Sequence, residues 1–372
     1  MPLRFRSLFQ FQESGLVLVV LVLGLCLTIF SGSVKQPVFK ILPDGTRERV
    51  FVTGPDGQQT AAFEVKNKFL NARSLITLAK QTSFIAIMAV GMAVVIISGG
   101  IDLSVGAIYA LASVIGALVL HHYGPNGPGS ATAPWVGVLL GAAACVGVGM
   151  LCGLVNGGLI LGLRMHPFII TLGTMAILRG IAFVLTTGQS VTDFPPQLQA
   201  IVNYEVGDGL SVVPLLVMVL ATIAGTIYLT RLAAGRRVYA VGGNELAARF
   251  SGINVSRVKL GVYFISGLAT GVAALMAIGC YGAASSSDGQ GYELNVIAAA
   301  VVGGASLTGG RGSALGAMLG ALVIQMIDTG IVDLDLDQNY SKIIIGSVII
   351  IAVALDTFNS WLARRRLEKQ AH

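Results

Sequence analysis

Polar side chains inside long apolar runs are the residues of this sequence that could do chemistry. Each such group costs free energy in lipid and usually faces the interior of a helix bundle, where it can contact a polar solute. The candidates for lining a path across a membrane are Asn156, Arg179, Asn295, Gln325 and Asp328. Arg179 and Asp328 could instead neutralise one another if their helices adjoin, and we favour that pairing over contact with a solute.

Enzymatic chemistry has little support in the residue pattern. There is no Gly-Lys dipeptide and hence no Walker A motif, and no Gly-x-Gly-x-x-Gly stretch follows a strand. No carboxylate–His or Ser–His arrangement emerges, and the histidines lack metal-ligand spacing. We therefore expect no metal and no cofactor in this chain, so any ATP that drives the protein must be bound by another chain.

Composition identifies the elements that must position these residues. The chain has 372 residues, of which 54% are hydrophobic and 11% charged, against about 25% charged in a typical soluble domain. This excludes a single-domain cytosolic enzyme and predicts an all-α polytopic membrane bundle of about ten transmembrane helices. The predicted spans are 15–32, 76–98, 104–121, 135–161, 168–187, 210–229, 260–281, 293–309, 313–331 and 342–360.

The positions of Lys and Arg orient these helices. The loops 122–134, 188–209, 282–292 and 332–341 contain neither residue, whereas 231–259 and the tail 361–372 are basic. By the positive-inside rule both termini are cytoplasmic, and the basic residues reflect topology rather than nucleic-acid binding. The first helix, within 1–32, could instead be a signal peptide.

Residues 33–75 precede the transmembrane domain 76–360 and are expected outside, although they are basic. Two Pro-Asp-Gly turns separate short β-branched or aromatic runs. This pattern predicts a three-stranded antiparallel meander with strands at 38–42, 50–53 and 61–65. It is either a decoration, which we favour, or an outside docking surface.

Glycines at four-residue spacing predict close helix packing, because they stack on one helix face and let a neighbouring backbone approach. The two main sets are Gly149, Gly153 and Gly157, and Gly312, Gly316 and Gly320. Two further glycine-rich stretches resemble each other and are expected at the inner ends of spans: Gly99 and Gly100 with Asp102 and Ser104, and Gly303 and Gly304. Asp102 or Ser104 can cap the following helix, and we favour this role for Asp102 over one in transport.

The inside segment 231–259 predicts a short helix over 245–251. Asn244 can cap its start, Gly252 can end it in a left-handed conformation, and Asn254 can start the next span. Glu245 and Arg249 are four residues apart, where an ion pair would support the helix. The segment is either a rigid lever or a charged loop that obeys the positive-inside rule.

Several motifs resemble bacterial ABC importer permeases of the ribose, xylose and arabinose type. Gly243–Val255 resembles their coupling loop, although the spacing from Glu245 to Gly252 departs from the general importer motif. Gly100–Gly106, Pro167–Thr174 and Gly291–Leu294 resemble other signatures of the family, and the match runs from about residue 71 to 358. The meander has no counterpart in that pattern.

The resemblance implies a non-catalytic permease subunit in a bacterial inner membrane that translocates a monosaccharide. It implies three protein partners: an ABC ATPase that holds ATP and Mg²⁺, a periplasmic sugar-binding protein, and a second permease copy in a homodimer or heterodimer. Asn244, Glu245, Arg249, Gly252 and Asn254 would then couple the permease to the ATPase. An ion-coupled secondary transporter with Asp328 as proton carrier is the alternative.

Overall fold

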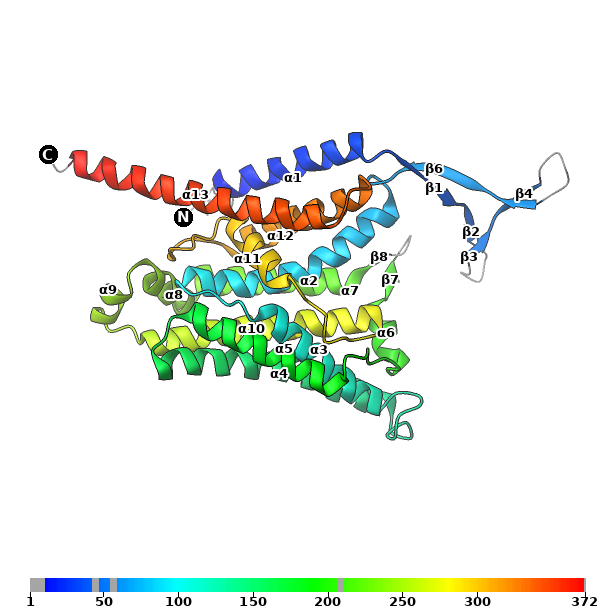
Figure 1. Cartoon of the computed structure of the whole chain (residues 1–372), viewed down its shortest axis with the longest axis horizontal. Helices are drawn as coiled ribbons and strands as arrows, with labels where there is room; N and C mark the ends of the chain where they lie inside the picture. Colours follow the sequence, from blue (N-terminus) through cyan, green and yellow to red (C-terminus); the bar gives the residue numbers. More distant parts are fainter. Residues whose placement is uncertain (1–10, 42–46, 54–58, 207–209, 371–372) are drawn as a thin grey trace, which may run out of the picture.

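The protein is a bundle of helices from which a set of strands projects at one end (Figure 1). The computed structural model describes the backbone of residues 11–41, 47–53, 59–206 and 210–370. Seven helices within these residues are long and apolar enough to cross a membrane: α2 (Ala72–Ile97), α3 (Val105–His122), α4 (Pro134–Leu163), α5 (Pro167–Thr186), α7 (Val212–Arg231), α10 (Val255–Tyr281) and α12 (Ala314–Asp333). The polytopic all-α fold is thereby confirmed.

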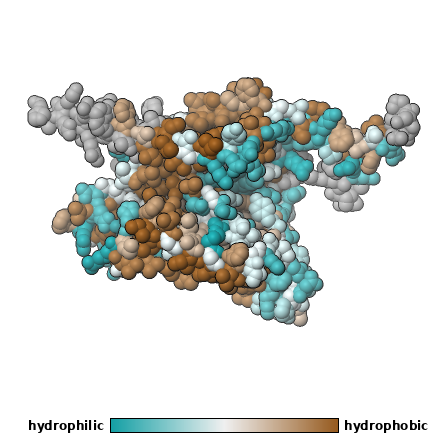
Figure 2. Space-filling view, in the orientation of Figure 1, coloured by the Kyte–Doolittle hydropathy of each residue, from teal (hydrophilic) through white to brown (hydrophobic). Residues whose placement is uncertain are grey.

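Three further helices coincide with predicted spans: α1 (Phe11–Phe30), α11 (Tyr292–Val302) and α13 (Asn339–Gln370). The backbone of α13 extends through most of the predicted tail. Short helices complete the set: α6 (Pro196–Val202), α8 (Ala233–Gly243) and α9 (Glu245–Phe250). Apolar side chains cover much of one face, and hydrophilic ones gather over α8 and α9 (Figure 2).

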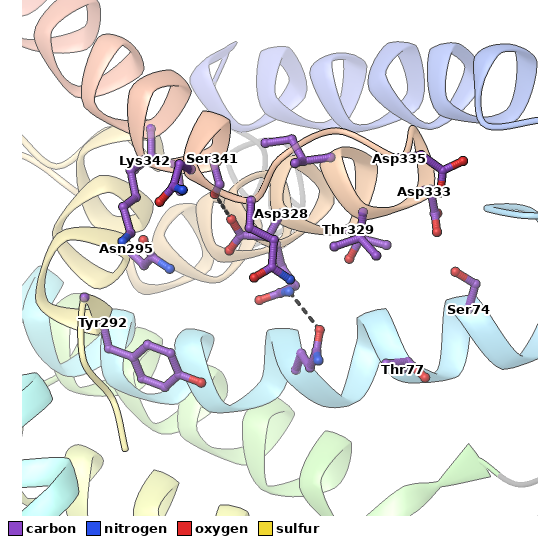
Figure 3. Close-up of a pocket in the computed structure, with 18 of the residues that line it drawn as sticks. Ser74, Thr77, Tyr292, Asn295, Asp328, Thr329, Asp333, Asp335, Ser341 and Lys342 are labelled. Atoms are coloured by element: carbon purple, nitrogen blue, oxygen red, sulfur yellow. Dashed lines mark hydrogen bonds between the residues drawn. The ribbon is translucent and has the colours of Figure 1, made fainter. Parts of the chain in front are cut away.

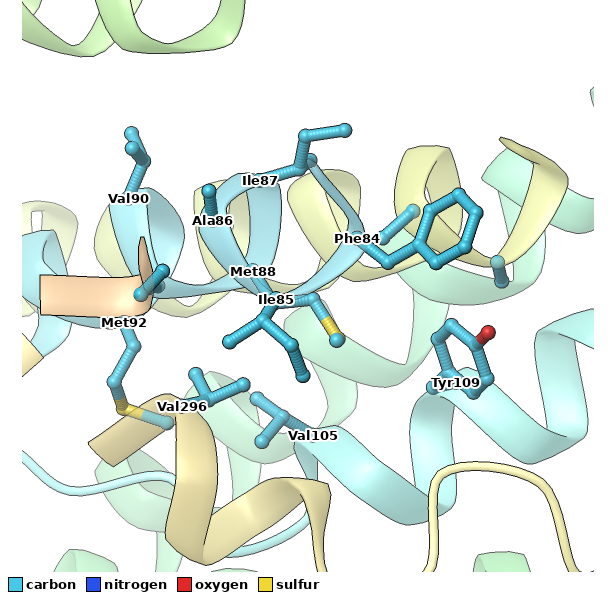
Figure 4. Close-up of a cluster of buried hydrophobic side chains, with 14 of the residues drawn as sticks. Phe84, Ile85, Ala86, Ile87, Met88, Val90, Met92, Val105, Tyr109 and Val296 are labelled. Atoms are coloured by element: carbon cyan, nitrogen blue, oxygen red, sulfur yellow. The ribbon is translucent and has the colours of Figure 1, made fainter. Parts of the chain in front are cut away.

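Helix α2 is the centre of the core. All its residues from Thr82 to Ile97 are buried, and it packs against α7, α10, α11 and α12. Figure 4 shows Ile85 and Met92 of this helix near Val105 of α3 and Val296 of α11, and Phe84 near Tyr109 of α3. Because α2 is apolar on every side from Phe84 to Ile97, other helices can surround this part of it.

Close packing of α4 against α10 confirms the first glycine set. A Cβ atom at Gly153 would lie 2.3 Å from the Tyr263 carbonyl oxygen, and one at Gly149 would lie 2.4 Å from the Gly267 carbonyl oxygen. Gly157 packs against Leu260. The two backbones therefore touch along one face, as small residues permit in a membrane.

The second set is confirmed only in part. A Cβ at Gly316 would lie 2.1 Å from the Gly303 oxygen, and a Cβ at Gly320 would lie 2.0 Å from the Ala299 oxygen. These two glycines therefore pack α12 against α11. The prediction for Gly312 is wrong, since α12 is capped by Ser313 and begins at Ala314. Gly312 has φ +144° in the preceding loop, where glycine is favoured.

Helix α11 is shorter than the predicted span 293–309. Its 11 residues rise only about 16 Å, roughly half of a hydrocarbon core. The non-helical segments on either side, 282–291 and 303–313, complete this part of the fold. Irregular backbone at membrane depth is tolerated where protein covers it, and Ala284, Gly289 and Ala305 are buried. The starts of α11 and α3 meet inside the bundle, since a Cβ at Gly106 would lie 2.4 Å from Glu293 Oε2.

The strands between α1 and α2 form an arm, but not the predicted meander. Strand β1 (Ser33–Pro37) pairs with β6 (Phe63–Asn67), β2 (Phe39–Ile41) with β3 (Arg47–Arg49), and β4 (Phe51–Thr53) with β5 (Gln59–Ala61), all antiparallel. The two Pro-Asp-Gly segments lie outside the described residues. Backbone bonds join Val38, Val50 and Ala62 in a cycle. The arm is therefore a two-stranded stem that carries two hairpins.

The segments predicted to be outside meet at one end of the bundle, which also holds β7 (Glu205–Val206) and β8 (Leu210–Ser211) (Figure 1). The segments predicted to be outside contact one another through a Lys68–Asp335 ion pair, a Val191–Ala284 β-bridge and a hydrogen bond from the Asn126 amide to the Asp193 carboxylate. Helices α8 and α9, the start of α1 and the end of α13 lie at the opposite end. The segments predicted to lie outside thus gather at one end of the bundle, and those predicted to lie inside gather at the other.

Candidate functional site

A cavity of about 1100 Å³, the main cavity, lies between α2, α11, α12 and α13 at the end that carries the arm. Three of the predicted path residues line it: Asn295 of α11, and Gln325 and Asp328 of α12 (Figure 3). Helical spacing places Gln325 and Asp328 on one face of α12, because residues three apart are neighbours on a helix surface. Three of the five predicted path residues therefore share one cavity, and their role in a path stays a prediction.

Polar groups from neighbouring helices complete the lining. Gln325 Nε2 donates to Gln81 Oε1 of α2 at 2.9 Å, and the Ser341 hydroxyl of α13 donates to Asp328 Oδ1 (Figure 3). Sequence reasoning missed further polar residues of the wall, among them Ser74, Thr77, Gln81, Thr329, Ser341 and Lys342, and the wall also holds Lys68, Arg73, Asp333 and Asp335. Most of these groups are uncharged donors and acceptors, an arrangement that suits a polar, neutral solute.

The root of the arm forms part of the rim of the main cavity. Val34, Gln36 and Lys68 line it, and Lys68 Nζ lies 2.5 Å from Asp335 Oδ2 in the turn between α12 and α13. Asp335 has φ +55°, a left-handed conformation that is uncommon for a residue other than glycine. The arm is therefore tied to the cavity rather than being a remote decoration.

Charge exchange tests this tie. Lys68→Glu alone places like charges at the rim, and we expect a few-fold change in solute uptake with little change in stability, because exposed ion pairs contribute at most about 1 kcal/mol. Lys68→Glu combined with Asp335→Lys restores opposite charges and is expected to restore uptake. Equal uptake by the single variant and the wild type would show that the contact has no role.

The remaining path candidates lie elsewhere. Arg179 Nη1 donates to the backbone oxygens of Ser286 and Asp288 at 2.8 and 2.6 Å. The predicted Arg179–Asp328 pair is therefore wrong, because each side chain finds its partner on a segment that the sequence does not place beside it.

Asn156 belongs to a buried polar cluster. Its Nδ2 donates to Ser104 Oγ at 2.7 Å, and this hydroxyl donates to Asp102 Oδ1 at 2.6 Å. Asp102 also accepts from the Ser104 amide at 3.0 Å and from the Ser266 hydroxyl at 3.3 Å. The Ser104 hydroxyl makes no cap bond, so Asp102 supplies the acceptor at the start of α3. The cluster ties α3 to α4 and α10.

At the other end, the predicted short helix is α9, with its caps confirmed. Asn244 accepts from the Ala247 amide at 2.9 Å, and Asn254 accepts from the Arg257 amide at 3.0 Å. Gly252 has φ +81°, the left-handed conformation expected after a helix. The prediction of a Glu245–Arg249 pair is wrong: Glu245 Oε2 lies 2.8 Å from Lys259 Nζ on α10. The tertiary fold brings this lysine closer than the helical neighbour.

Two apolar residues of α9 project into solvent. Phe250 is 89% exposed and Leu246 is 66% exposed on this helix of six residues. These two exposed apolar side chains are available for contact with a partner protein. Sequence reasoning missed both residues because it followed the charges.

Helix α8 links this end to the glycine junctions. The Gly310 amide donates to the Ile97 oxygen at 2.8 Å, and a Cβ at Gly242 would lie 1.7 Å from the same oxygen. Gly99 and Gly304 have φ +81° and +92°. The end of α8 therefore packs between the end of α2 and the loop 303–313, at the end of the bundle that carries α9.

Comparison with known proteins assigns the family. The family model described as "Branched-chain amino acid transport system / permease component" matches residues 74–353. The ribose import permease protein RbsC of Escherichia coli (strain K12) is 37% identical over 290 residues, 77% of this chain and 87% of the relative. The chain belongs to this permease family.

Other relatives of the permease carry different sugar names. The fructose import permease protein FrcC of Rhizobium meliloti is 35% identical, over 78% of this chain and 79% of its own length. The D-allose transport system permease protein AlsC of Escherichia coli (strain K12) is 35% identical, over 77% and 84%. The matched family region begins at residue 74 and so excludes the arm of the permease.

Proposed function

We propose that this permease is the non-catalytic membrane subunit of an ATP-driven importer for a monosaccharide. Support comes from the relatives, whose names specify import of ribose, fructose and allose. The uncharged donors and acceptors of the main cavity, among them Gln81, Asn295 and Gln325, can hydrogen-bond the hydroxyls of a sugar. The family description mentions branched-chain amino acids, so the class of solute is the first thing to test.

One structural observation carries the proposal: the main cavity and the exposed helix α9 lie at opposite ends of one connected bundle. Gly242 at the end of α8 contacts Ile97 of α2, and Gln81 of the same α2 lines the cavity. A force applied to α9 can thus reach the cavity wall through α8 and α2. This is the arrangement that a two-state transporter driven from one side requires.

The proposal includes the partners and the topology. An ABC ATPase that binds ATP and Mg²⁺ would contact Leu246 and Phe250, beside the predicted coupling residues. A periplasmic binding protein would deliver the sugar to the arm end, and a second permease copy, identical or related, would complete the pathway. The chain would lie in the bacterial inner membrane with both termini cytoplasmic, as the positive-inside rule favours.

Reconstitution tests the proposal. The complex is purified through a tag on the permease, placed in liposomes and supplied with labelled ribose, fructose, allose or leucine. We expect uptake of at least one sugar that requires ATP and the binding protein. Uptake of leucine but of none of the three sugars would show that the substrate is an amino acid rather than a monosaccharide. Uptake by the permease alone, driven by an ion gradient, would instead favour the secondary transporter.

Asp328→Asn tests the main cavity as part of the path. The amide keeps the size of the side chain but removes the charge and one acceptor, so we expect ATP-driven uptake to fall about tenfold, with normal folding. Asp337→Asn is the matched control, because Asp337 lies in the nearby turn and accepts from the Asn339 amide without lining the cavity. Unchanged uptake by Asp328→Asn would place the path elsewhere.

A further inference from the structure

A second cavity of about 190 Å³, the tyrosine cavity, lies beside the main cavity. Tyr109 of α3, Tyr281 of α10 and Tyr292 of α11 line it, together with polar residues of two loops. Tyr281 and Tyr292 also line the main cavity, so they form the partition between the two spaces. Sequence analysis gave none of these tyrosines a role, although Tyr292 lies within the Gly291–Leu294 motif.

The three tyrosines contribute both aromatic rings and hydroxyl groups to the lining of the tyrosine cavity. The rings of Tyr109 and Tyr292 are 5.4 Å apart at 58°, and Phe84 packs edge-on against Tyr281 at 5.9 Å, which holds the rings in place. Within the part of the chain that the structure describes, no protein group hydrogen-bonds to the three tyrosine hydroxyls. Tyr109 is 4% exposed and Tyr281 is 58% exposed, and the hydroxyls reach the open space of the cavities, where a polar ligand can supply their partner.

The loop that closes the cavity is held rigidly. Arg179 binds the backbone oxygens of Ser286 and Asp288, and Asp288 Oδ2 accepts from the Ser285 amide at 2.8 Å. Val191 and Ala284 exchange two backbone bonds of 2.8 and 2.9 Å, which join this loop to the one that contains Ser190. A preorganised loop with a carboxylate at a set position can orient a ligand at low entropic cost.

The lining selects a chemical class. The polar groups are the tyrosine hydroxyls, Ser190, Ser285 and the Asp288 carboxylate, and no basic side chain is among the described lining residues. A solute with its own carboxylate would find no basic side chain in the lining to bind it, because Arg179, whose charge acts on Asp288, is held by the backbone oxygens of Ser286 and Asp288 and is not among the lining residues. The volume equals that of several waters, each about 30 Å³. A neutral molecule with one CH face for an aromatic ring and a rim of hydroxyls fits these features.

We propose that the tyrosine cavity is a monosaccharide-binding subsite, which opens to the main cavity across the Tyr281–Tyr292 partition. The inference rests on the proposed function, since it assigns a specific binding site to the solute of the transport path. Aromatic faces would stack on the sugar ring, and Asp288 would accept hydrogen bonds from its hydroxyls.

Photolabelling of the full chain in lipid nanodiscs tests the subsite. The probes are diazirine derivatives of ribose, fructose and allose, and labelled residues are mapped by mass spectrometry. We expect labelling within 282–292 and around Tyr109 that the free sugar suppresses. Labelling confined to α12 and α13, or no suppressible labelling with any of the three probes, would overturn the subsite.

Two variants sharpen the test. Tyr109→Phe keeps the ring but removes a hydroxyl, and we expect sugar affinity to fall about three- to tenfold. Tyr204→Phe is the matched control, because Tyr204 is exposed and lines neither cavity. Wild-type affinity in Tyr109→Phe, with ATP-driven sugar uptake intact, would refute the subsite and leave the proposed function standing. Absence of ATP-driven sugar uptake by the wild-type complex would refute the function itself.

Discussion

Replacing Phe250 by Asp is expected to abolish ATP-driven uptake while the amount of folded permease stays unchanged. Phe250 is 89% exposed on the short helix α9, and substitutions at such positions rarely change stability by more than about 0.5 kcal/mol. An aspartate that becomes buried against a partner costs far more, because a charge without a counter-ion loses its hydration. We expect a fall in uptake of about 100-fold, equivalent to about 3 kcal/mol of lost interaction.

Two measurements separate coupling from folding in this experiment. Co-purification of the ATPase with the tagged permease reports the interface, and thermal unfolding of the permease reports the fold. Phe250→Tyr is the matched control, since it keeps the ring and should keep uptake. If Phe250→Asp retains both the ATPase and normal uptake, α9 is not the coupling surface.

Replacing Gly153 by Leu is expected to have the largest effect on stability. A Cβ at this position would lie 2.3 Å from the Tyr263 oxygen, a backbone atom that cannot move aside without shifting α10. Overpacking of this kind costs about 3 kcal/mol, and separation of the two helices would also disturb the Asp102–Ser104–Asn156 cluster. We therefore expect a much lower yield of folded protein.

Gly158 on the same helix provides a matched control. A Cβ at Gly158 meets nothing within 4 Å, so Gly158→Leu adds the same side chain without a clash. Size-exclusion yield and thermal unfolding of the two variants are compared side by side. Equal stability would show that the α4–α10 contact tolerates separation and that the glycine spacing is not a packing device.

The predictions that held concern patterns confined to one stretch of chain. Hydropathy located the helices, because a span needs a continuous apolar run whatever its neighbours are. Four-residue glycine spacing marked the faces of α4 and α12, and side-chain caps marked the starts of α9 and α10, because both depend on residues within one or two turns. Gly312 failed because glycine spacing alone does not show where a helix begins.

Contacts between distant segments were decided only by the tertiary structure. Glu245 pairs with Lys259 and Arg179 binds a loop backbone, since a charged side chain takes the nearest suitable partner in space. The short α11 and the stem of the arm likewise depend on which segments cover their backbone groups.

The main cavity gathers Gln81, Asn295, Gln325 and Ser341 from four helices. The sequence by itself determined which residues are too polar for lipid, because that is a property of each side chain. Only the packing of the helices determined which of them share one space.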